Sequence, residues 1–323
     1  MVLPSPRSPL ELRDVPTPSP SDGDVLIRVR ACGVCRTDLH IVDGDLAEPS
    51  LPLTLGHQVV GDVVEVAADV RDVEPGTRVG VPWLGWMDGT CAWCTSGREN
   101  LCPNARFTGY ERDGGFAELL VADRRACLEI PDAREDVDAT PLLCAGAIGY
   151  RALRMAGDAA TLGLYGFGNA ARLVAQIARR EGRRVFAFTR PGDTQTQRDA
   201  LALGCAWAGD STSSPPEPLD AALLFAAVGD LVPLALAALE PGGVVVCAEI
   251  HMSDIPSFPY ELLWHERQLR SVANLTWRDG RELLEIASRF GIETQTQTFA
   301  LEDANAAIAA ARAGERGTMV LVP

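Results

Sequence analysis

The chain has 323 residues, a length that suits two domains better than a single hydrophobic core. Its 44 acidic and 29 basic residues give a formal charge of −15, so we expect neither nucleic acid nor a membrane surface as a partner. The N-terminus lacks an apolar run behind a basic start, and no later stretch has the length of a membrane span, so we expect a cytoplasmic protein.

The first part of the chain predicts short strands separated by glycine and proline turns. Residues 1–24 are rich in proline and serine and are expected to be irregular. Strands are expected at 24–31, 59–66 and 78–81, and no helical period is found before about residue 133. These features predict a mainly β domain that is closer to a barrel than to stacked layers.

The segment from Gly33 to His40 carries a thiol, a hydroxyl, a carboxylate and an imidazole directly after the first expected strand. Cys35 in this segment, His57 in the motif Gly-His-Gln and the later Cys144 together offer two thiolates and one imidazole. Such a set leaves one coordination position open, which is typical of a catalytic zinc site. We therefore predict a catalytic zinc on Cys35, His57 and Cys144.

A cysteine-rich loop is expected at about residues 86–104. Its cysteines form the pattern C-x2-C-x7-C, which predicts a lobe folded around a metal, and an aspartate one spacing ahead can supply the fourth ligand. The proposed ligands are Asp88, Cys91, Cys94 and Cys102. The alternative is three free thiols on a surface loop, which would be chemically reactive. The other cysteines are expected to be buried hydrophobic residues, and they are Cys32, Cys127, Cys205 and Cys247.

Strands and helices alternate from about residue 146. An apolar strand at 160–165 precedes the motif G-x-G-x-x-A and a helix with one apolar face. This order is typical of the phosphate-binding turn of a dinucleotide fold, where Gly166, Gly168 and Ala171 allow close approach to a pyrophosphate. Further strands are expected at 184–188, 221–225 and 244–248, and helices near 195–204 and 230–239. The repeated units predict a parallel, doubly wound sheet.

The last part of the chain returns to a mixed character. Helices are expected at 280–290 and 302–313, and a final strand at 318–322. We expect this tail to rejoin the first domain.

Motifs spread over nearly the whole chain carry a resemblance to a known family. They include GVCRTDLH, LPLTLGHQVVG, CAWCTSGRENLC, PLLCAG and LYGFGNAA. The chain resembles the zinc-dependent alcohol dehydrogenases of the medium-chain dehydrogenase/reductase superfamily, particularly a bacterial subgroup. The resemblance implies an α/β protein with a GroES-like catalytic domain at 1–145 and 273–323 and a Rossmann domain at 146–272.

The same resemblance implies the reaction and its cofactors. It implies hydride transfer between a primary or secondary alcohol, or the matching aldehyde or ketone, and NAD(P). Two zinc ions per subunit are expected, one catalytic and one structural. A small-molecule substrate and a homodimer or homotetramer are also expected.

Several residues of the GVCRTDLH motif take on roles by resemblance. Thr37 is expected to hydrogen-bond the substrate oxygen, and His40 to pass the proton outward. Asp38 is expected to orient a zinc-bound imidazole, and Arg36 to lie near the cofactor pyrophosphate. The alternative for His40 is a histidine with a purely structural role.

Other positions concern the substrate pocket or depart from the family pattern. Trp83 and Trp86 precede the cysteine loop, where the family builds its substrate pocket, and ordinary core packing is the alternative. Gln58 replaces a glutamate that could transiently bind zinc. Ile148 stands where relatives commonly have threonine, and Trp277 where an arginine is expected. These departures leave the substrate pocket and the turnover of the enzyme undetermined.

Cofactor choice depends on the end of the second strand of the dinucleotide fold. An NAD-preferring enzyme has an acidic residue about 20 residues beyond the glycine turn, and here that count from Gly168 reaches Thr189. The next residue, Arg190, offers a guanidinium suited to a 2′-phosphate, so we expect NADP(H) over NAD(H). Alternatively, Arg190 stacks on the adenine ring and permits either cofactor, and the carboxylate of Asp193 repels the 2′-phosphate of NADP(H).

Two other functions remain open at this point. The chain could be a quinone- or enoyl-reductase-like member of the superfamily that needs no zinc. It could also be a zinc-stabilised binding protein whose catalytic site has decayed.

Overall fold

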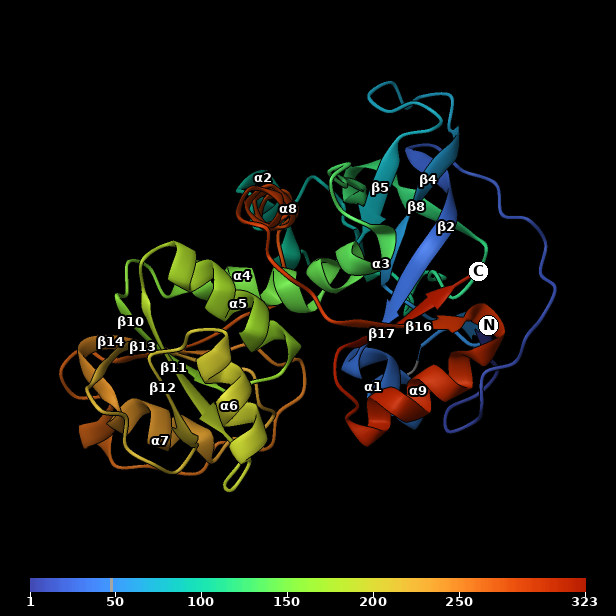
Figure 1. Ribbon diagram of the computed structural model, residues 1–323. Coiled ribbons are helices and arrows are strands. Elements are labelled where there is room, and N and C mark those ends of the chain that lie inside the picture. The colour runs from blue at the N-terminus through green and yellow to red at the C-terminus, as the bar shows by residue number, and fades with distance from the viewer. Residues whose placement is uncertain (47–48) are drawn as a thin grey trace. The chain divides into compact units, whose positions relative to one another are not determined.

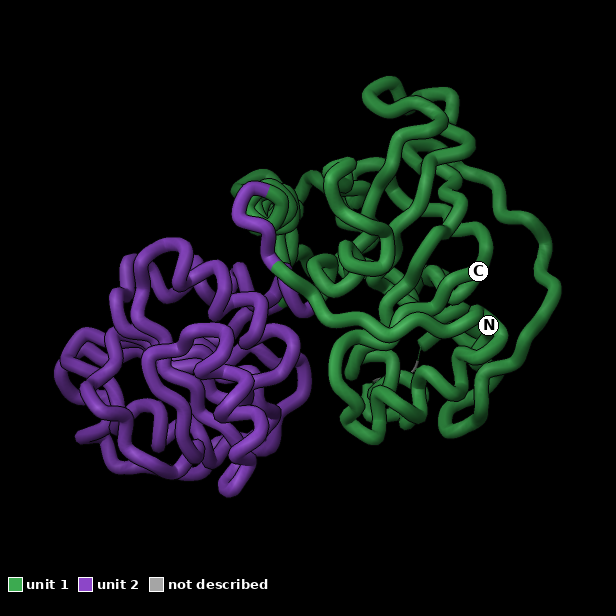
Figure 2. Tube along the Cα trace, viewed as in Figure 1, with its two compact units in different colours: residues 1–144, 274–288, 293–323 green, residues 145–273, 289–292 purple. Residues whose placement is uncertain are grey.

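The computed structural model describes residues 1–46 and 49–323, which form two compact units (Figures 1 and 2). Unit 1 contains Met1–Cys144, Asn274–Ser288 and Glu293–Pro323. Unit 2 contains Ala145–Ala273 and Arg289–Ile292. The second unit is therefore inserted into the chain of the first.

A seven-stranded sheet is the framework of unit 1. Its order is β16-β17-β2-β4-β5-β9, and β8 pairs with the first part of β2. In β2 the buried Ile27 and Val29 alternate with the exposed Arg28 and Arg30, because successive side chains point to opposite faces of a strand. The strands are β2 (Asp24–Val34), β4 (Gln58–Val66), β5 (Arg78–Val81), β8 (Leu119–Asp123), β9 (Leu128–Glu129), β16 (Thr296–Ala300) and β17 (Thr318–Val322).

Smaller elements surround this sheet. Two short antiparallel pairs join β1 (Val2–Leu3) to β3 (Leu53–Thr54) and β6 (Leu84–Trp86) to β7 (Arg106–Phe107). The helices of unit 1 are α1 (Arg36–Asp43), α2 (Ala92–Thr95), α3 (Asp136–Ala139), most of α8 (Trp277–Phe290) and α9 (Ala304–Ala313). The expectation of no helix before about residue 133 is wrong, because α1 and α2 both precede that point.

The C-terminal tail belongs to unit 1. Strand β17 pairs antiparallel with β2, with Val320 opposite Gly33, and β16 extends the sheet beside β17. The prediction that the tail rejoins the first domain is therefore confirmed. Helices α8 and α9 and strand β17 correspond to the three elements expected there.

A six-stranded parallel sheet is the framework of unit 2. Its order is β12-β11-β10-β13-β14-β15, which is the doubly wound order of a Rossmann fold. The predicted parallel sheet is therefore confirmed. The strands are β10 (Thr161–Tyr165), β11 (Arg184–Thr189), β12 (Trp207–Asp210), β13 (Leu219–Leu224), β14 (Leu239–Cys247) and β15 (Gln268–Ser271).

Helix α4 (Ala145–Met155) precedes the first of these strands, and three helices connect strands of the sheet, namely α5 (Asn169–Arg180), α6 (Thr194–Ala202) and α7 (Leu231–Ala237). Helix α5 forms because its apolar residues recur on one face, and Leu173, Val174 and Ile177 are buried there. The edge strands β12 and β15 were not predicted. Every residue of β15 is exposed, so its sequence contains no apolar pattern.

Two further findings concern the sequence-based expectations. The four cysteines outside the clusters are all buried, which confirms them as hydrophobic residues of the core. Within the described residues, no helix combines the length and the apolar character that crossing a membrane requires.

Candidate metal centres and cofactor-binding turn

Helix α1 presents the chemically active residues of unit 1. Its first turn is held by a capping box in which the Cys35 sulfur accepts the Thr37 N–H at 3.2 Å and Asp38 Oδ2 accepts the Cys35 N–H at 2.8 Å. The helix ends at Gly44, whose φ of 73° is left-handed and favours glycine. The capping box therefore fixes the position of the Cys35 sulfur at the end of β2.

Cys35 meets two residues that are distant in the sequence. Its Sγ lies 3.1 Å from Nε2 of His57, which directly precedes β4, and 3.9 Å from Sγ of Cys144. Two sulfurs bound to one zinc at about 2.3 Å with a tetrahedral angle lie about 3.8 Å apart. The spacing of this triad, together with its two thiols and one imidazole, fits zinc with one position open.

The carboxylate of Asp38 faces the other nitrogen of the His57 ring. Asp38 Oδ1 and His57 Nδ1 are 3.3 Å apart, both side chains are fully buried, and neither atom has another hydrogen-bond partner among the described residues. Burial raises the pKa of Asp38. An acceptor at Nδ1 keeps that nitrogen protonated and leaves Nε2 free to bind a metal.

Charges within the triad shift the pKa values of its members in opposite directions. The hydrogen bond from Cys144 is the largest influence on Cys35 and lowers its pKa well below that of a free thiol. Burial works to lower the pKa of His57, but the negative charges of Cys35 and Asp38 outweigh burial and raise it well above its usual value. In both cases the neighbouring groups of the cluster, and not burial, decide the direction of the pKa shift.

His40 lies in the last turn of α1, nearer to solvent. Its Nδ1 is 2.9 Å from Asp45 Oδ2, and the two side chains are 17% and 43% exposed. The Asp45 N–H also bonds the His40 carbonyl at 2.9 Å, because the turn at Gly44 folds the chain back over the helix end. Thr37 is partly exposed on the same helix, and Arg36 is exposed.

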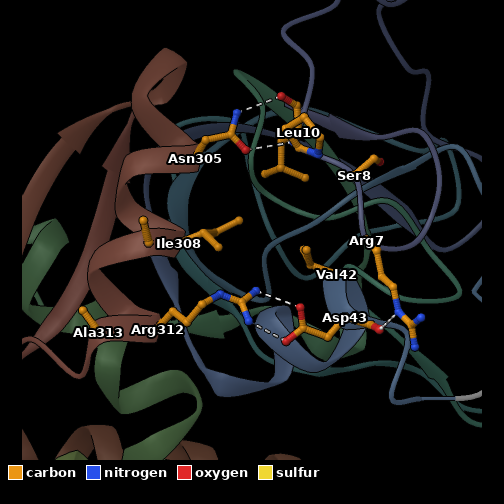
Figure 3. Close-up of a pocket in the computed structure, with 11 residues that line it drawn as sticks. Arg7, Ser8, Leu10, Val42, Asp43, Asn305, Ile308, Arg312 and Ala313 are labelled. Atoms are coloured by element: carbon orange, nitrogen blue, oxygen red, sulfur yellow. Dashed lines mark hydrogen bonds and ion pairs between the residues drawn. The ribbon is translucent and has the colours of Figure 1, made fainter.

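A groove of about 580 Å³ lies at the C-terminal end of α1, between α9 and the N-terminal segment (Figure 3). Arg312 of α9 forms a two-pronged ion pair with Asp43, at 2.7 and 2.8 Å. The backbone N–H of Arg7 bonds the Val42 carbonyl, and its Nε bonds the Asp43 carbonyl. These contacts anchor the helix that carries Cys35 and His40.

Aromatic side chains pack beside the triad. The Trp83 ring meets His57 edge-on at a centroid distance of 4.8 Å. Phe107 and Tyr110, which the sequence did not identify, stack on Trp83 at 5.1 and 5.7 Å. Trp86 is instead half-buried, and Arg106 lies over its ring. The structure therefore places Trp83, and not Trp86, against a candidate metal ligand.

The three departures from the family pattern have distinct surroundings. Gln58 is 1% exposed, and its Oε1 has no hydrogen-bond partner in the part of the chain that the structure describes. Its amide occupies the space that a side chain at Gly33 would need. The Trp277 indole donates to the Leu84 carbonyl at the start of α8. Ile148 lies on α4 in unit 2 and is partly buried.

The cysteine loop brings its four predicted ligands together. Their ligand atoms all lie within 4.8 Å of one another. Sγ of Cys91 and Cys94 are 3.5 Å apart, and Cys102 Sγ is 3.3 Å from Asp88 Oδ2. Tetrahedral zinc would separate two sulfurs by about 3.8 Å and a sulfur from a carboxylate oxygen by about 3.6 Å. The cluster therefore fits a closed four-ligand site.

The glycine turn of unit 2 leaves room for a phosphate group. Gly166 has a φ of 86°, and a Cβ there would come within 2.9 Å of Ala226, so only glycine fits. Gly168 caps α5 without a side-chain hydrogen bond, and nothing lies within 4 Å of the position of its absent Cβ. The N-terminus of a helix beside open space fits a dinucleotide pyrophosphate.

Residues after β11 lie where a cofactor ribose is expected in this fold. Thr189 is 2% exposed, and its hydroxyl accepts the Gln197 side-chain N–H at 3.1 Å. Arg190 is exposed, and its guanidinium has no hydrogen bond or ion pair within the described residues. Asp193 caps α6 by accepting the Thr196 N–H at 3.0 Å. Of these residues, Arg190 has the side chain that is available to a ligand.

Comparisons with known proteins cover the whole chain. The family description "Alcohol dehydrogenase GroES-like domain" matches residues 21–132. A probable alcohol dehydrogenase of Mycobacterium tuberculosis, AdhA, is 42% identical over 99% of this chain and 94% of that protein. An alcohol dehydrogenase of Geobacillus stearothermophilus is 33% identical over 93% of this chain and 91% of that protein.

Solved structures agree with these relatives. One, described as a zinc-binding dehydrogenase of Sinorhizobium meliloti and bound to NADP, has a TM-score of 0.89 and 27% identity, covering 100% of this chain and 98% of that one. The alcohol dehydrogenase of Aeropyrum pernix has a TM-score of 0.87 and 27% identity, covering 100% of this chain and 99% of that one.

Proposed function

The chain belongs to the alcohol dehydrogenases of the medium-chain dehydrogenase/reductase superfamily, and from this membership we propose which residues carry out its reaction. It is an NAD(P)-dependent oxidoreductase that acts on alcohols. We propose that unit 1 is the catalytic domain and unit 2 the cofactor domain. The observation that supports this most directly is the triad of Cys35, His57 and Cys144, whose ligand atoms all lie within 4.8 Å of one another in unit 1.

Cys35, His57 and Cys144 would hold the catalytic zinc. When bound there, zinc supplies Lewis-acid polarisation of a substrate hydroxyl or carbonyl oxygen, which makes loss or gain of a hydride easier. Asp38 holds the His57 ring so that Nε2 faces the thiols. The aromatic cluster around Trp83 excludes water from one side of the triad and would contact the organic part of the substrate.

Neither a zinc-independent reductase nor a zinc-stabilised binding protein with a decayed catalytic site explains this geometry as well. A zinc-independent reductase has no use for two thiols gathered around the imidazole of the buried His57. A decayed site would not need to keep Asp38 buried against His57, since burying an ionisable group is costly. Two measurements decide between these three functions: the zinc content of the protein, and the change in NAD(P)H absorbance when a panel of alcohols and aldehydes is added. A zinc-free or inactive preparation would favour one of the alternatives.

We propose that the substrate proton leaves along α1. The Thr37 hydroxyl would take the proton from the substrate, and His40 would pass it on. The contact between His40 Nδ1 and Asp45 Oδ2 holds the imidazole in place and leads to a carboxylate that is open to solvent.

Replacing His40 with alanine lowers kcat for alcohol oxidation by about 10²-fold near pH 7, because a positioned proton carrier contributes about that much. Added imidazole restores part of the rate. The control is His265→Asn in unit 2, which keeps a residue type that tolerates the φ of 71° at that position. Steady-state kinetics measure the effect, and an unchanged kcat in His40→Ala rules out the proposed pathway.

We propose that NADP(H) is preferred to NAD(H). Gly166, Gly168 and the first N–H groups of α5 would hold the pyrophosphate, with Ala171 buried behind them. The exposed guanidinium of Arg190 would bind the 2′-phosphate, and no acidic side chain occupies the end of β11. Thr189 supports the turn from inside, through its bond with Gln197. By its place in the family, Arg36 would contribute charge near the pyrophosphate.

We propose that the cysteine loop holds a second, structural zinc on Asp88, Cys91, Cys94 and Cys102. The site is closed because four protein atoms fill a tetrahedral shell. Burial raises the pKa of Cys94 to about 12 without a metal, so zinc binding must expel this proton.

Replacing Asp88 with alanine lowers the zinc content from two ions per chain toward one and lowers the melting temperature, because a three-ligand site holds zinc weakly. Asp88→Cys keeps both ions. Metal analysis after gel filtration and a thermal melt measure these results. Asp132→Ala, an exposed aspartate outside the loop, is the control. Two tightly held ions in Asp88→Ala would contradict the site.

We also propose a homodimer or homotetramer in the cytoplasm. The edge strand β15 supports assembly, since its exposed residues leave a row of backbone groups without a strand partner. Nine free cysteines suit a reducing compartment. A native mass equal to one 34.5 kDa chain would contradict the assembly.

A further inference from the structure

Asp88 differs from the other ligands of the cysteine loop because it is a carboxylate. A carboxylate has two oxygens and about four lone-pair directions, so it can bind a metal in several ways or turn away from it. A thiolate has one ligating atom and no such choice. An aspartate in this position therefore needs neighbours that hold one oxygen toward the metal.

Three N–H donors surround this carboxylate. Its Oδ1 accepts the backbone N–H groups of Thr90 and Cys91, each at 2.9 Å. Its Oδ2 accepts the side-chain N–H of Asn104 at 2.8 Å. These bonds lower the pKa of Asp88, with the Cys91 N–H as the largest cause and Asn104 the next.

The donors leave one direction on the carboxylate for a metal. Two N–H groups use both lone pairs of Oδ1, and Asn104 uses one of Oδ2. The remaining lone pair belongs to Oδ2, the oxygen that lies 3.3 Å from Cys102 Sγ. The carboxylate is thus held for binding through Oδ2 alone.

Only one of the three donors is a side chain. The two backbone N–H groups are set by the loop and would remain with any residue at position 88. Asn104 is exposed, lies beyond Cys102 in the chain, and none of the other described hydrogen bonds involves its side chain. Its amide thus serves the carboxylate and no other described group.

We propose that Asn104 is a positioning residue for the structural metal, and that it fixes Asp88 Oδ2 as the fourth ligand of the cysteine loop. This inference rests on the proposed zinc on that loop. Partners that hydrogen-bond a metal ligand typically change metal affinity by about 10- to 100-fold. Asn104 is therefore needed where position 88 is a carboxylate and dispensable where it is a thiolate.

The test is a double-mutant cycle on the full-length holoenzyme. Zinc release to a chromophoric chelator is followed in wild type, Asn104→Leu, Asp88→Cys and the double variant. Asn104→Leu speeds release of the loop zinc by about 10-fold in the wild-type background. It has no effect in the Asp88→Cys background. A Cys35→Ser variant lacks the catalytic zinc, so the release phase that is missing from this variant belongs to the catalytic zinc and the remaining phase to the loop zinc.

A matched control lies within the same loop. Ser96→Ala removes a hydroxyl that bonds the Trp93 carbonyl, at 3.1 Å, and the Arg98 Nε. It leaves the release rate unchanged. Equal acceleration by Asn104→Leu in both backgrounds would show a merely structural role and overturn the inference, as would a wild-type rate in Asn104→Leu. A wild-type protein without zinc on the loop would instead refute the underlying proposal.

Discussion

Replacing Cys35 with serine, or Cys144 with alanine, lowers kcat/KM for alcohol oxidation by at least about 10³-fold. The reason is that Lewis-acid activation of the substrate oxygen contributes several kcal/mol, and each 1.4 kcal/mol corresponds to about tenfold in rate. The two sulfurs, 3.9 Å apart, are two of the three candidate ligands, so losing either leaves two ligands. Steady-state kinetics and metal analysis measure the result.

The same variants should keep their fold and their cofactor affinity. The glycine turn and Arg190 belong to unit 2, whereas the triad belongs to unit 1. Fluorescence titration with NADPH should give the wild-type dissociation constant. Cys205→Ala, which removes a buried thiol from unit 2 outside both clusters, is the control and keeps normal turnover. Turnover above a few per cent of wild type in Cys35→Ser would show that the assigned site is wrong.

Reversing the charge at Arg190 lowers the preference for NADPH over NADH by at least about 10²-fold. A hydrogen bond to a charged group contributes about 1.5–3 kcal/mol, and Arg190→Asp replaces that attraction by repulsion of the 2′-phosphate. Arg190 is suitable for this test because it is exposed and has no described partner to lose. A substitution at Thr189 would instead bury a new group, since that side chain is 2% exposed.

The ratio of kcat/KM values for the two cofactors measures this preference. Arg198→Asp, on the exposed face of α6, makes the same change in net charge and should leave the ratio unaltered. Wild-type enzyme that prefers NADH would contradict the proposal. An unchanged ratio in Arg190→Asp would contradict the role given to this residue.

The metal clusters were predictable because their chemistry is visible in residue type and spacing. Cys91, Cys94 and Cys102 lie so close in sequence that one loop must bring them together. The partnership of Cys35 with Cys144 spans 109 residues, and residue type alone pointed to it. The residues that contact these sites from outside were not predictable. Asn104, which bonds Asp88, and Tyr110, which stacks on Trp83, belong to no recognisable sequence pattern and are placed by the fold of the loops.

Secondary structure was predictable where the burial of an element produces a recognisable pattern of apolar residues in the sequence. Strands β10 and β11 are apolar runs and were found, whereas the exposed β15 was missed. Helix α1 was also missed, because its buried apolar residues are only Leu39, Ile41 and Val42, too few to show a helical repeat. Its start depends on a capping box with a cysteine sulfur, an unusual cap that sequence rules do not anticipate.

The pairing of β17 with β2 has a consequence for the order of biosynthesis. Met319, Val320 and Leu321 are paired with Val34, Gly33 and Cys32, directly before Cys35. These partners are translated only after the whole of unit 2. Until β17 is translated, the strand that leads into the candidate zinc-binding triad has an open edge on that side, which is a place where another chain can pair. A nascent or C-terminally truncated chain is therefore exposed to misassociation at the segment that presents Cys35.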